Sequence, residues 1–170
     1  MIKPLKGKIE LNNKNLQENI NDWQKMIGYV SQEVYLADES ILFNIILKKI
    51  GKKIDMSRVN HLVDILDLNE LVKSKRDGLD TTVGDKGITV SGGQMERIGI
   101  ARALYDKPKI LILDEATNAL DYDTQNKVLK NMYDEMEEET VISVSHDKNA
   151  LKYCEKVYSV KKNKIEKIIL

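Results

Sequence analysis

The sequence predicts an α/β fold in which a mostly parallel sheet is covered by helices and carries a small helical lobe. Three observations support this. Short apolar runs alternate along the chain with segments of helical period. The run Ile110–Leu113 has four successive apolar residues, which is typical of a strand buried on both faces of a parallel sheet. Apolar residues at helical spacing from Val59 to Leu66 predict the lobe, at about Ser40–Asp80.

The remaining elements also have local reasons. The alternation in "GKIELNNKNL" predicts a half-exposed strand, and "MIGYVSQ" a short apolar strand. Ser91 and Gln94 have the Ser-x-x-Gln spacing of a capping box, so a helix is expected over Gly92–Tyr105, ended by Pro108. Thr124–Glu137 predicts a helix with one apolar face. "TVISVSH" predicts a buried strand, and "KVYSVKKNKIEKII" a closing hairpin.

Composition excludes several classes of protein. The 27 basic and 27 acidic side chains cancel, so no nucleic-acid partner is expected. The single cysteine, Cys154, rules out an internal disulfide and suits a reducing compartment. No signal peptide and no apolar run of membrane-spanning length occur, so any membrane role is expected to be peripheral.

Polar side chains follow three of the predicted strands, where sites in parallel sheets lie. They are Gln32, Asp114, Glu115 and His146. A carboxylate here can hold Mg²⁺ through its water shell, and a second can orient or deprotonate an attacking water. Taken singly, each also fits a plainer interpretation, in which a strand ends in acidic loop residues or in a histidine without catalytic use.

Five short motifs occur in order, and together they are more specific than any one of them. They are "VSQ" with Gln32, "SGGQ" at Ser91–Gln94, "ILILDE" at Ile110–Glu115, "NALD" at Asn118–Asp121 and "SHD" at Ser145–Asp147. Their order and spacing resemble the nucleotide-binding domain of ABC transporters along essentially the whole chain. The plainer alternative for "SGGQ" is that Gly92 and Gly93 only shape a turn before a capped helix.

The resemblance implies a role for each motif residue, with ATP and Mg²⁺ as ligands. Gln32 would be the Q-loop glutamine, near Mg²⁺ and the attacking water. Asp114 would serve Mg²⁺, Glu115 would be the catalytic glutamate, and His146 the switch histidine at the γ-phosphate. The signature motif Ser91, Gly92, Gly93 and Gln94, together with Asp121 of the D-loop, would bind the nucleotide of the opposite subunit in a head-to-tail dimer.

The resemblance also implies the architecture and the setting. The fold would be a partial P-loop NTPase (RecA-like) core with a helical ABC subdomain, in a single truncated domain spanning 1–170. Residues 40–80 and the helix at 91–105 would form the helical lobe, and residues 1–39 and 106–170 the α/β core. The partners would be a second nucleotide-binding domain and transmembrane domains, at the cytoplasmic face of the cell membrane. "ESILFNI" and "DTTVGDKGITVSGGQ" resemble exporter or flippase domains, although His146–Asp147 is more typical of importers.

One expected motif does not occur in these 170 residues. No Gly-x-x-x-x-Gly-Lys-Ser/Thr phosphate loop is found, and "GDKGIT" has the wrong spacing. Losing three charge-assisted hydrogen bonds, about 1.5–3 kcal/mol each, would weaken ATP binding on the order of 10³- to 10⁶-fold. We therefore expect a C-terminal part of such a domain that holds ATP poorly alone and exposes apolar faces of Ile110–Leu113 and Val141–Val144.

Three functions stay open on the sequence. The first is the ATPase of an exporter or flippase, active when complete. The second is a non-enzymatic half-site that lends Ser91 and Asp121 to a partner carrying the phosphate loop. The third is a soluble ABC-type ATPase of translation or DNA repair, which the exporter-like segments and the lack of long coiled-coil insertions disfavour.

Overall fold

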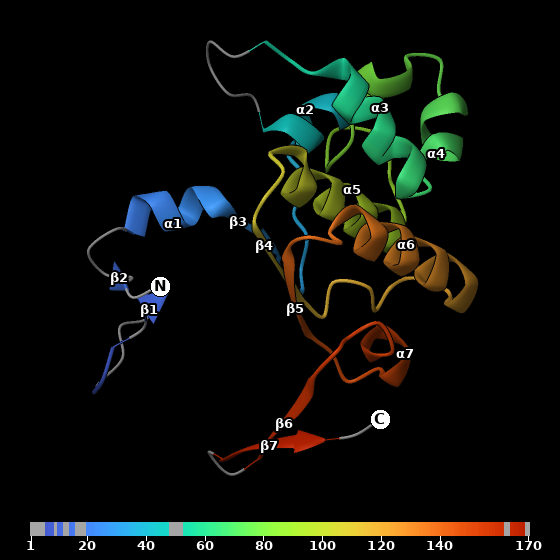
Figure 1. Ribbon diagram of the computed structural model, residues 1–170. Coiled ribbons are helices and arrows are strands. Elements are labelled where there is room, and N and C mark those ends of the chain that lie inside the picture. The colour runs from blue at the N-terminus through green and yellow to red at the C-terminus, as the bar shows by residue number, and fades with distance from the viewer. Residues whose placement is uncertain are drawn as a thin grey trace.

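The computed structural model describes residues 6–8, 10–11, 14–15, 20–47, 53–161 and 164–168. Figure 1 shows the arrangement of its elements. In chain order these are β1 (Glu10–Leu11), β2 (Lys14–Asn15), α1 (Ile20–Met26), β3 (Ile27–Val30), α2 (Ile41–Ile46), α3 (Met56–Ile65), α4 (Asn69–Lys73), the 3₁₀ helix η2 (Gly78–Asp80), α5 (Gly92–Tyr105), β4 (Ile110–Asp114), α6 (Tyr122–Glu135), β5 (Thr140–Val144), α7 (Lys148–Leu151), β6 (Val157–Lys161) and β7 (Lys164–Ile168).

A three-stranded parallel sheet lies at the centre, in the order β3-β4-β5. Ile27 pairs with Ile110, and Ile110 pairs with Thr140, so the three strands begin level with one another. Their carboxyl ends therefore meet at one edge, as the alternation of strands and helices predicts. The predicted α/β fold with a mostly parallel sheet is confirmed.

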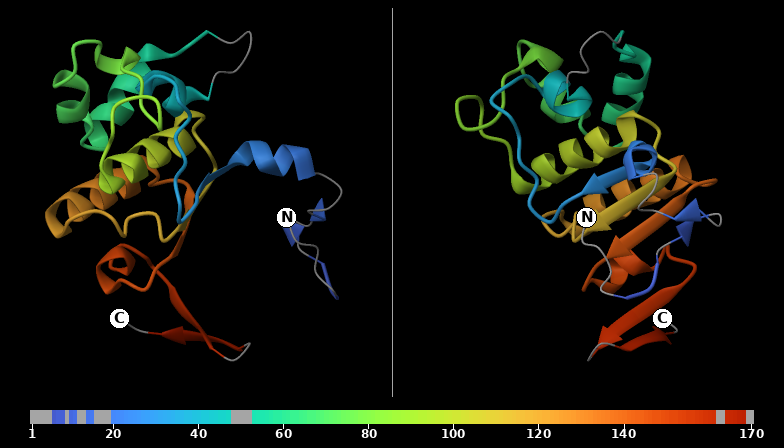
Figure 2. Two further views of the ribbon diagram at one scale, coloured as in Figure 1. Left: turned by 180° about the vertical axis from the view of Figure 1, so that it is seen from behind. Right: turned by 90° about the vertical axis from the view of Figure 1, so that its left-hand side faces the viewer.

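Helices cover one face of this sheet. Gly28 and Val30 of β3 and Leu111 and Leu113 of β4 point to that face and are buried. In Figures 1 and 2, α5 and α6 lie on this side. A Cβ on Gly28 would stand 2.7 Å from the carbonyl oxygen of Ala103, so α5 lies against β3 more closely than a larger residue would allow.

The opposite face of the sheet is open among the described residues. Tyr29 is 56% exposed, Ile142 49% and Val144 50%. The prediction that Ile110–Leu113 is buried on both faces is therefore wrong, because its side chains alternate between buried and partly exposed positions. The four apolar residues in a row did identify the strand. The prediction that "TVISVSH" is a buried strand is also wrong, because the residues of β5 alternate between exposed and partly exposed positions. The expected exposure of apolar side chains falls mainly on this strand.

The short helices α2, α3, α4 and η2 gather at one end of the molecule, next to α5 (Figure 1). The predicted stripe is confirmed, since Val59, Leu62 and Leu66 are each fully buried. Asp55 caps α3 by accepting a hydrogen bond from the backbone N–H of Arg58. The assignment of these helices, with the helix at 91–105, to a separate lobe stays a prediction.

Polar contacts connect α3 with α6. Arg58 and His61 of α3 both bind the carboxylate of Glu135 on α6, the histidine through its Nε2 at 2.7 Å. One turn further along, the side chain of Asn131 donates to the carbonyl oxygen of Ile65 at 2.8 Å. These contacts fix how the two helices lie against each other.

The ends of the chain agree in part with the sequence. β6 and β7 form the predicted antiparallel hairpin, in which Lys161 pairs with Lys164 and residues 162–163 lie outside the described part. The strand predicted in "GKIELNN" is seen as β1, paired with β2, although residues 9, 12 and 13 are outside the description. Within the described residues, no helix has the length and apolar character needed to cross a bilayer.

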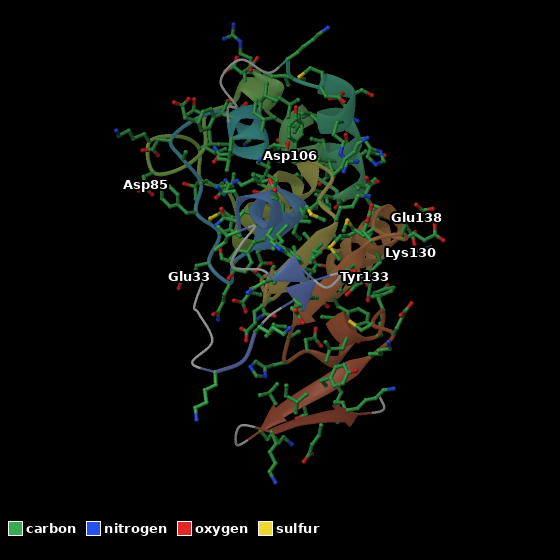
Figure 3. All side chains as sticks on the ribbon, turned by 60° about the vertical axis from the view of Figure 1, so that its left-hand side comes forward. Glu33, Asp85, Asp106, Lys130, Tyr133 and Glu138 are labelled. Atoms are coloured by element: carbon green, nitrogen blue, oxygen red, sulfur yellow. The ribbon has the colours of Figure 1, made fainter. Side chains whose placement is uncertain are left out.

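The two faces of the sheet should respond differently to truncation. Leu111→Ala removes a fully buried side chain and should lower the free energy of unfolding by about 2–5 kcal/mol. Ile142→Ala removes a half-exposed one and should cost less than about 1.5 kcal/mol. Chemical denaturation measures both. Lys130→Ala, on the outer side of α6 (Figure 3), is the control. If Leu111→Ala and Ile142→Ala lowered the free energy of unfolding equally, the conclusion that one face of the sheet is open would be contradicted.

The contact between α3 and α6 should make stability depend on pH. Burial alone would raise the pKa of Glu135, but hydrogen bonds from His61 and Arg58 outweigh it and lower the pKa. This stabilisation is complete above the ordinary glutamate pKa of about 4.3 and is lost as the pH falls below it. Glu135→Gln should cost roughly 1–3 kcal/mol at pH 7 and clearly less at pH 3, measured by denaturation at each pH. A cost independent of pH would contradict this assignment.

Candidate functional site

The carboxylate of Glu115, just after β4, is the centre of a polar cluster at the carboxyl edge of the sheet. Its Oε2 accepts hydrogen bonds from Nε2 of Gln32 at 3.0 Å and from Nδ2 of Asn118 at 3.1 Å. Nε2 of His146 lies 3.2 Å from its Oε1. The parallel register explains the convergence, because Gln32, Glu115 and His146 follow β3, β4 and β5 in turn.

The backbone of Glu115 is unusual. Its φ is +52°, in the left-handed region that a residue with a Cβ adopts at a cost of order 1–3 kcal/mol. Its N–H donates to the carbonyl oxygen of Val144 at 2.9 Å, as part of the parallel pairing of Asp114 with Val144. Strained backbone of this kind is concentrated at functional sites, and here it aims the Glu115 carboxylate at Gln32 and His146.

Asp114 ends β4 one residue earlier and points to the open face of the sheet. Its Oδ2 accepts a hydrogen bond from the hydroxyl of Tyr29 at 3.0 Å, and this bond raises the pKa of Tyr29. Among the described residues, no three His, Cys, Asp or Glu side chains come together as a metal site. Mg²⁺ is commonly held by one or two protein oxygens together with phosphates and water. The carboxylate of Asp114 and the amide oxygen of Gln32 fit such a partial donor set.

The predicted capping box at the start of α5 is confirmed. Oγ of Ser91 accepts from the backbone N–H of Gln94 at 3.2 Å, and Oε1 of Gln94 accepts from the backbone N–H of Ser91 at 2.9 Å. Ser91 and Gly92 are exposed. The first amides of a helix have no partner within it, so those of Gly92 and Gly93 can donate to an anion.

The two glycines also let a neighbouring loop approach α5. A Cβ on Gly92 would be 3.2 Å from the Cβ of Ala119. A Cβ on Gly93 would be 3.0 Å from Cδ2 of Leu120 and 3.1 Å from the carbonyl oxygen of Ala119. The plainer interpretation of these glycines, close packing at a turn, is therefore part of their role.

Asp121 and Asp147 both begin helices. Asp121 caps α6 by accepting from the backbone N–H of Thr124 at 3.0 Å, and the bonds from Thr124 lower its pKa. Asp147 caps α7 through Asn149 and accepts from the side chain of Gln125 at 3.0 Å. Asp147, the aspartate after His146, thus has a structural use.

The predicted site residues form two groups. Gln32, Asp114, Glu115 and His146 meet at the carboxyl edge of the sheet, whereas Ser91, Gly92, Gly93 and Gln94 lie at the start of α5, against the loop that leads to Asp121. In the described part of the chain, no hydrogen bond joins the two groups directly. Sequence reasoning missed the contacts of Tyr29 and Asn118; Asn118 lies in a motif that was noted, and Tyr29 carries no signal of its own.

Comparisons with known proteins show which family the chain is similar to. Residues 1–118 match the family model described as ABC transporter. The chain is 34% identical over 163 residues to the alpha-hemolysin translocation ATP-binding protein HlyB of Proteus vulgaris, covering 95% of this chain and 23% of that protein. It is 36% identical over 160 residues to a putative export ATP-binding/permease protein of Rickettsia typhi, covering 94% and 27%.

A solved structure also matches. The structure of a bacterial Atm1-family ABC exporter with ATP bound superposes with a TM-score of 0.79 at 28% identity, over 88% of this chain and 26% of that one. The chain thus spans about a quarter of the length of these relatives. With the fold, the motif order and the family model in agreement, the chain belongs to the ABC transporter family.

Proposed function

We propose that this chain supplies catalytic and signature residues of an ATP-hydrolysing site that energises export across a membrane. The observation that carries the proposal is the convergence of Gln32, His146 and Asn118 on the carboxylate of Glu115 at the edge of a parallel sheet. A carboxylate held from both oxygens has a defined orientation. Hydrolysis of ATP needs such positioning, because phosphoryl transfer depends on placement and charge stabilisation more than on covalent chemistry.

Each residue would have a separate task. Glu115 would orient the attacking water and take its proton. His146 lies at Oε1 of Glu115 with its side chain largely exposed, so it can also reach a γ-phosphate that stands beyond the carboxylate. Gln32 would hold Glu115 through its amide nitrogen and present its amide oxygen to the metal.

Magnesium would be held by Asp114 and Gln32. When bound, the ion neutralises charge that develops on the transferred phosphoryl group. The hydroxyl of Tyr29 donates its hydrogen bond to Oδ2 of Asp114. The other carboxylate oxygen, Oδ1, does not take part in this bond and can face the ion or its water shell.

The signature residues would act on a second copy or a related subunit. The start of α5 presents Ser91 and Gly92 to solvent, with helix amides suited to an anion. In a head-to-tail dimer, the signature motif Ser91–Gln94 would bind the nucleotide held by the opposite subunit, with Asp121 beside it. Transmembrane domains at the cytoplasmic face of the membrane would be the further partners, as the names of the exporting relatives suggest.

A second function is favoured by one specific observation. These 170 residues contain no Gly-x-x-x-x-Gly-Lys-Ser/Thr motif, while the start of α5 is exposed and ready to meet an anion. The chain would then act as a half-site, lending Ser91 and Asp121 to a nucleotide that a partner holds. It would not need its own Glu115 for that role.

Substitution of the proposed base separates the two functions. Glu115→Gln should keep Mg·ATP binding within about 3-fold and lower turnover at least 10²-fold in the assembled dimer, because an amide cannot accept the proton of the attacking water. Equilibrium binding and phosphate release measure these. Glu70→Gln, exposed on α4, is the matched control. Unchanged turnover in Glu115→Gln would refute the ATPase proposal for this site and leave the half-site.

The isolated chain should bind ATP weakly. Without a phosphate loop in the 170 residues, we expect Mg·ATP affinity in the millimolar range or weaker, since the lost hydrogen bonds correspond to on the order of 10³-fold or more. Adding a partner that carries the loop should restore micromolar binding, and Ser91→Ala should weaken that gain. Isothermal titration with and without the partner measures this. Tight stoichiometric binding by the chain alone would contradict the expectation.

A further inference from the structure

A buried carboxylate on α5 lies outside all the roles described so far. Glu96, in the second turn of the helix, is 7% exposed. Its Oε1 and Oε2 lie 3.0 and 3.1 Å from the backbone nitrogen of Ala119, which donates a hydrogen bond to this carboxylate. Burial raises the pKa of Glu96, and the bond from Ala119 opposes that rise. An acidic side chain is rarely buried without a specific partner, and here the described partner is one loop amide.

The loop that holds this amide rests on α5 at further points. Gly92 and Gly93 leave room for Ala119 and Leu120, as a Cβ on either glycine would come within 3.2 Å of them. The loop is therefore held at two points on α5: the Glu96 side chain accepts its hydrogen bond, and the loop packs closely on the two glycines at the helix start. Ala119 N–H is the donor that the Glu96 carboxylate fixes in place.

The residue before the anchored amide reaches the centre of the site. Asn118 donates through Nδ2 to Oε2 of Glu115 at 3.1 Å, beside the bond from Gln32. Because Asn118 and Ala119 share one peptide unit, fixing the N–H of Ala119 also fixes the point from which the Asn118 side chain starts. A displacement of the start of α5 would carry Asn118 with it.

We propose that Glu96 is a positioning residue that holds the loop Thr117–Asp121 on α5 and thereby keeps Asn118 on the carboxylate of Glu115. The inference rests on the proposed function, because the orientation of Glu115 has a catalytic consequence only in an ATPase. It gives the signature helix a second use, as the support for the chain's own Glu115.

Two substitutions of Glu96 separate positioning from packing. Glu96→Leu keeps most of the side-chain volume but leaves the N–H of Ala119 without an acceptor. Glu96→Gln keeps an acceptor oxygen without the charge, so it should retain the hydrogen bond from the N–H of Ala119. Two signals are followed by NMR on the full 170-residue chain without nucleotide: hydrogen exchange of the Ala119 amide, and the side-chain NH₂ resonance of Asn118. Glu115→Ala gives the reference position for an Asn118 side chain released from its partner.

In Glu96→Leu, we expect exchange of the Ala119 amide to accelerate by about 10-fold or more, as for a lost hydrogen bond to a charged group. The Asn118 resonance should move toward its position in Glu115→Ala. Glu96→Gln should stay within about 3-fold of the wild type in exchange, with Asn118 unmoved. Glu70→Leu, on the exposed side of α4, controls for the loss of a carboxylate.

Three results would overturn the proposal. They are unchanged Ala119 exchange and Asn118 resonance in Glu96→Leu, failure of Glu96→Gln to rescue, and an Asn118 resonance in the wild type equal to that in Glu115→Ala. The third needs no Glu96 variant, so it decides even if Glu96→Leu does not fold. Because none of these signals uses ATP, absence of hydrolysis would refute the proposed function while leaving this measurement interpretable.

Discussion

The close approach of α5 to its surroundings is the constraint on which the rest of the structure depends. Gly28 brings β3 to the backbone of Ala103, and a Cβ on Gly99 would be 2.8 Å from Val34 in the segment after Gln32. The guanidinium of Arg102 donates to the carbonyl oxygens of Asn44 at 2.8 Å and Tyr35 at 3.0 Å, and burial lowers its pKa. One helix therefore supports the sheet, the segment that carries Gln32 and the short helix α2. A shift of α5 would disturb all three at once.

The polar cluster at the carboxyl edge of the sheet depends on register as much as on residue identity. The β4–β5 pairing places Asp114 opposite Val144, and the next N–H, that of Glu115, still bonds to Val144. This bond anchors the backbone of Glu115, whose φ is +52°. Asp114 then meets Tyr29 on the open face, while Glu115 meets Gln32 and His146 at the edge. The two adjacent acids therefore have different partners on different sides of the sheet edge.

Local signals in the sequence were sufficient for most elements of the fold. The capping box at Ser91 fixed the start of α5, and the helix observed has the predicted bounds, Gly92–Tyr105. The helix predicted at Thr124–Glu137 is observed at Tyr122–Glu135, so both of its ends lie two residues earlier than predicted, and Asp121 caps its start. What the sequence could not predict depends on long-range geometry. A positive φ at Glu115 has no local signature, and the bond from Ala119 to Glu96 joins residues 23 positions apart.

The burial of Glu96 also indicates how the two groups of site residues depend on each other. A glutamate with one described amide donor is less stable ionised than it would be in water, so its position lowers the stability of the fold at neutral pH. Because the folded pKa is raised, this cost is present above that pKa and disappears as the pH falls toward the ordinary glutamate value. An apolar side chain would avoid the cost but would remove the carboxylate that accepts the hydrogen bond from the amide of Ala119. The carboxylate is therefore best explained by what it holds, the loop between Glu115 and Asp121.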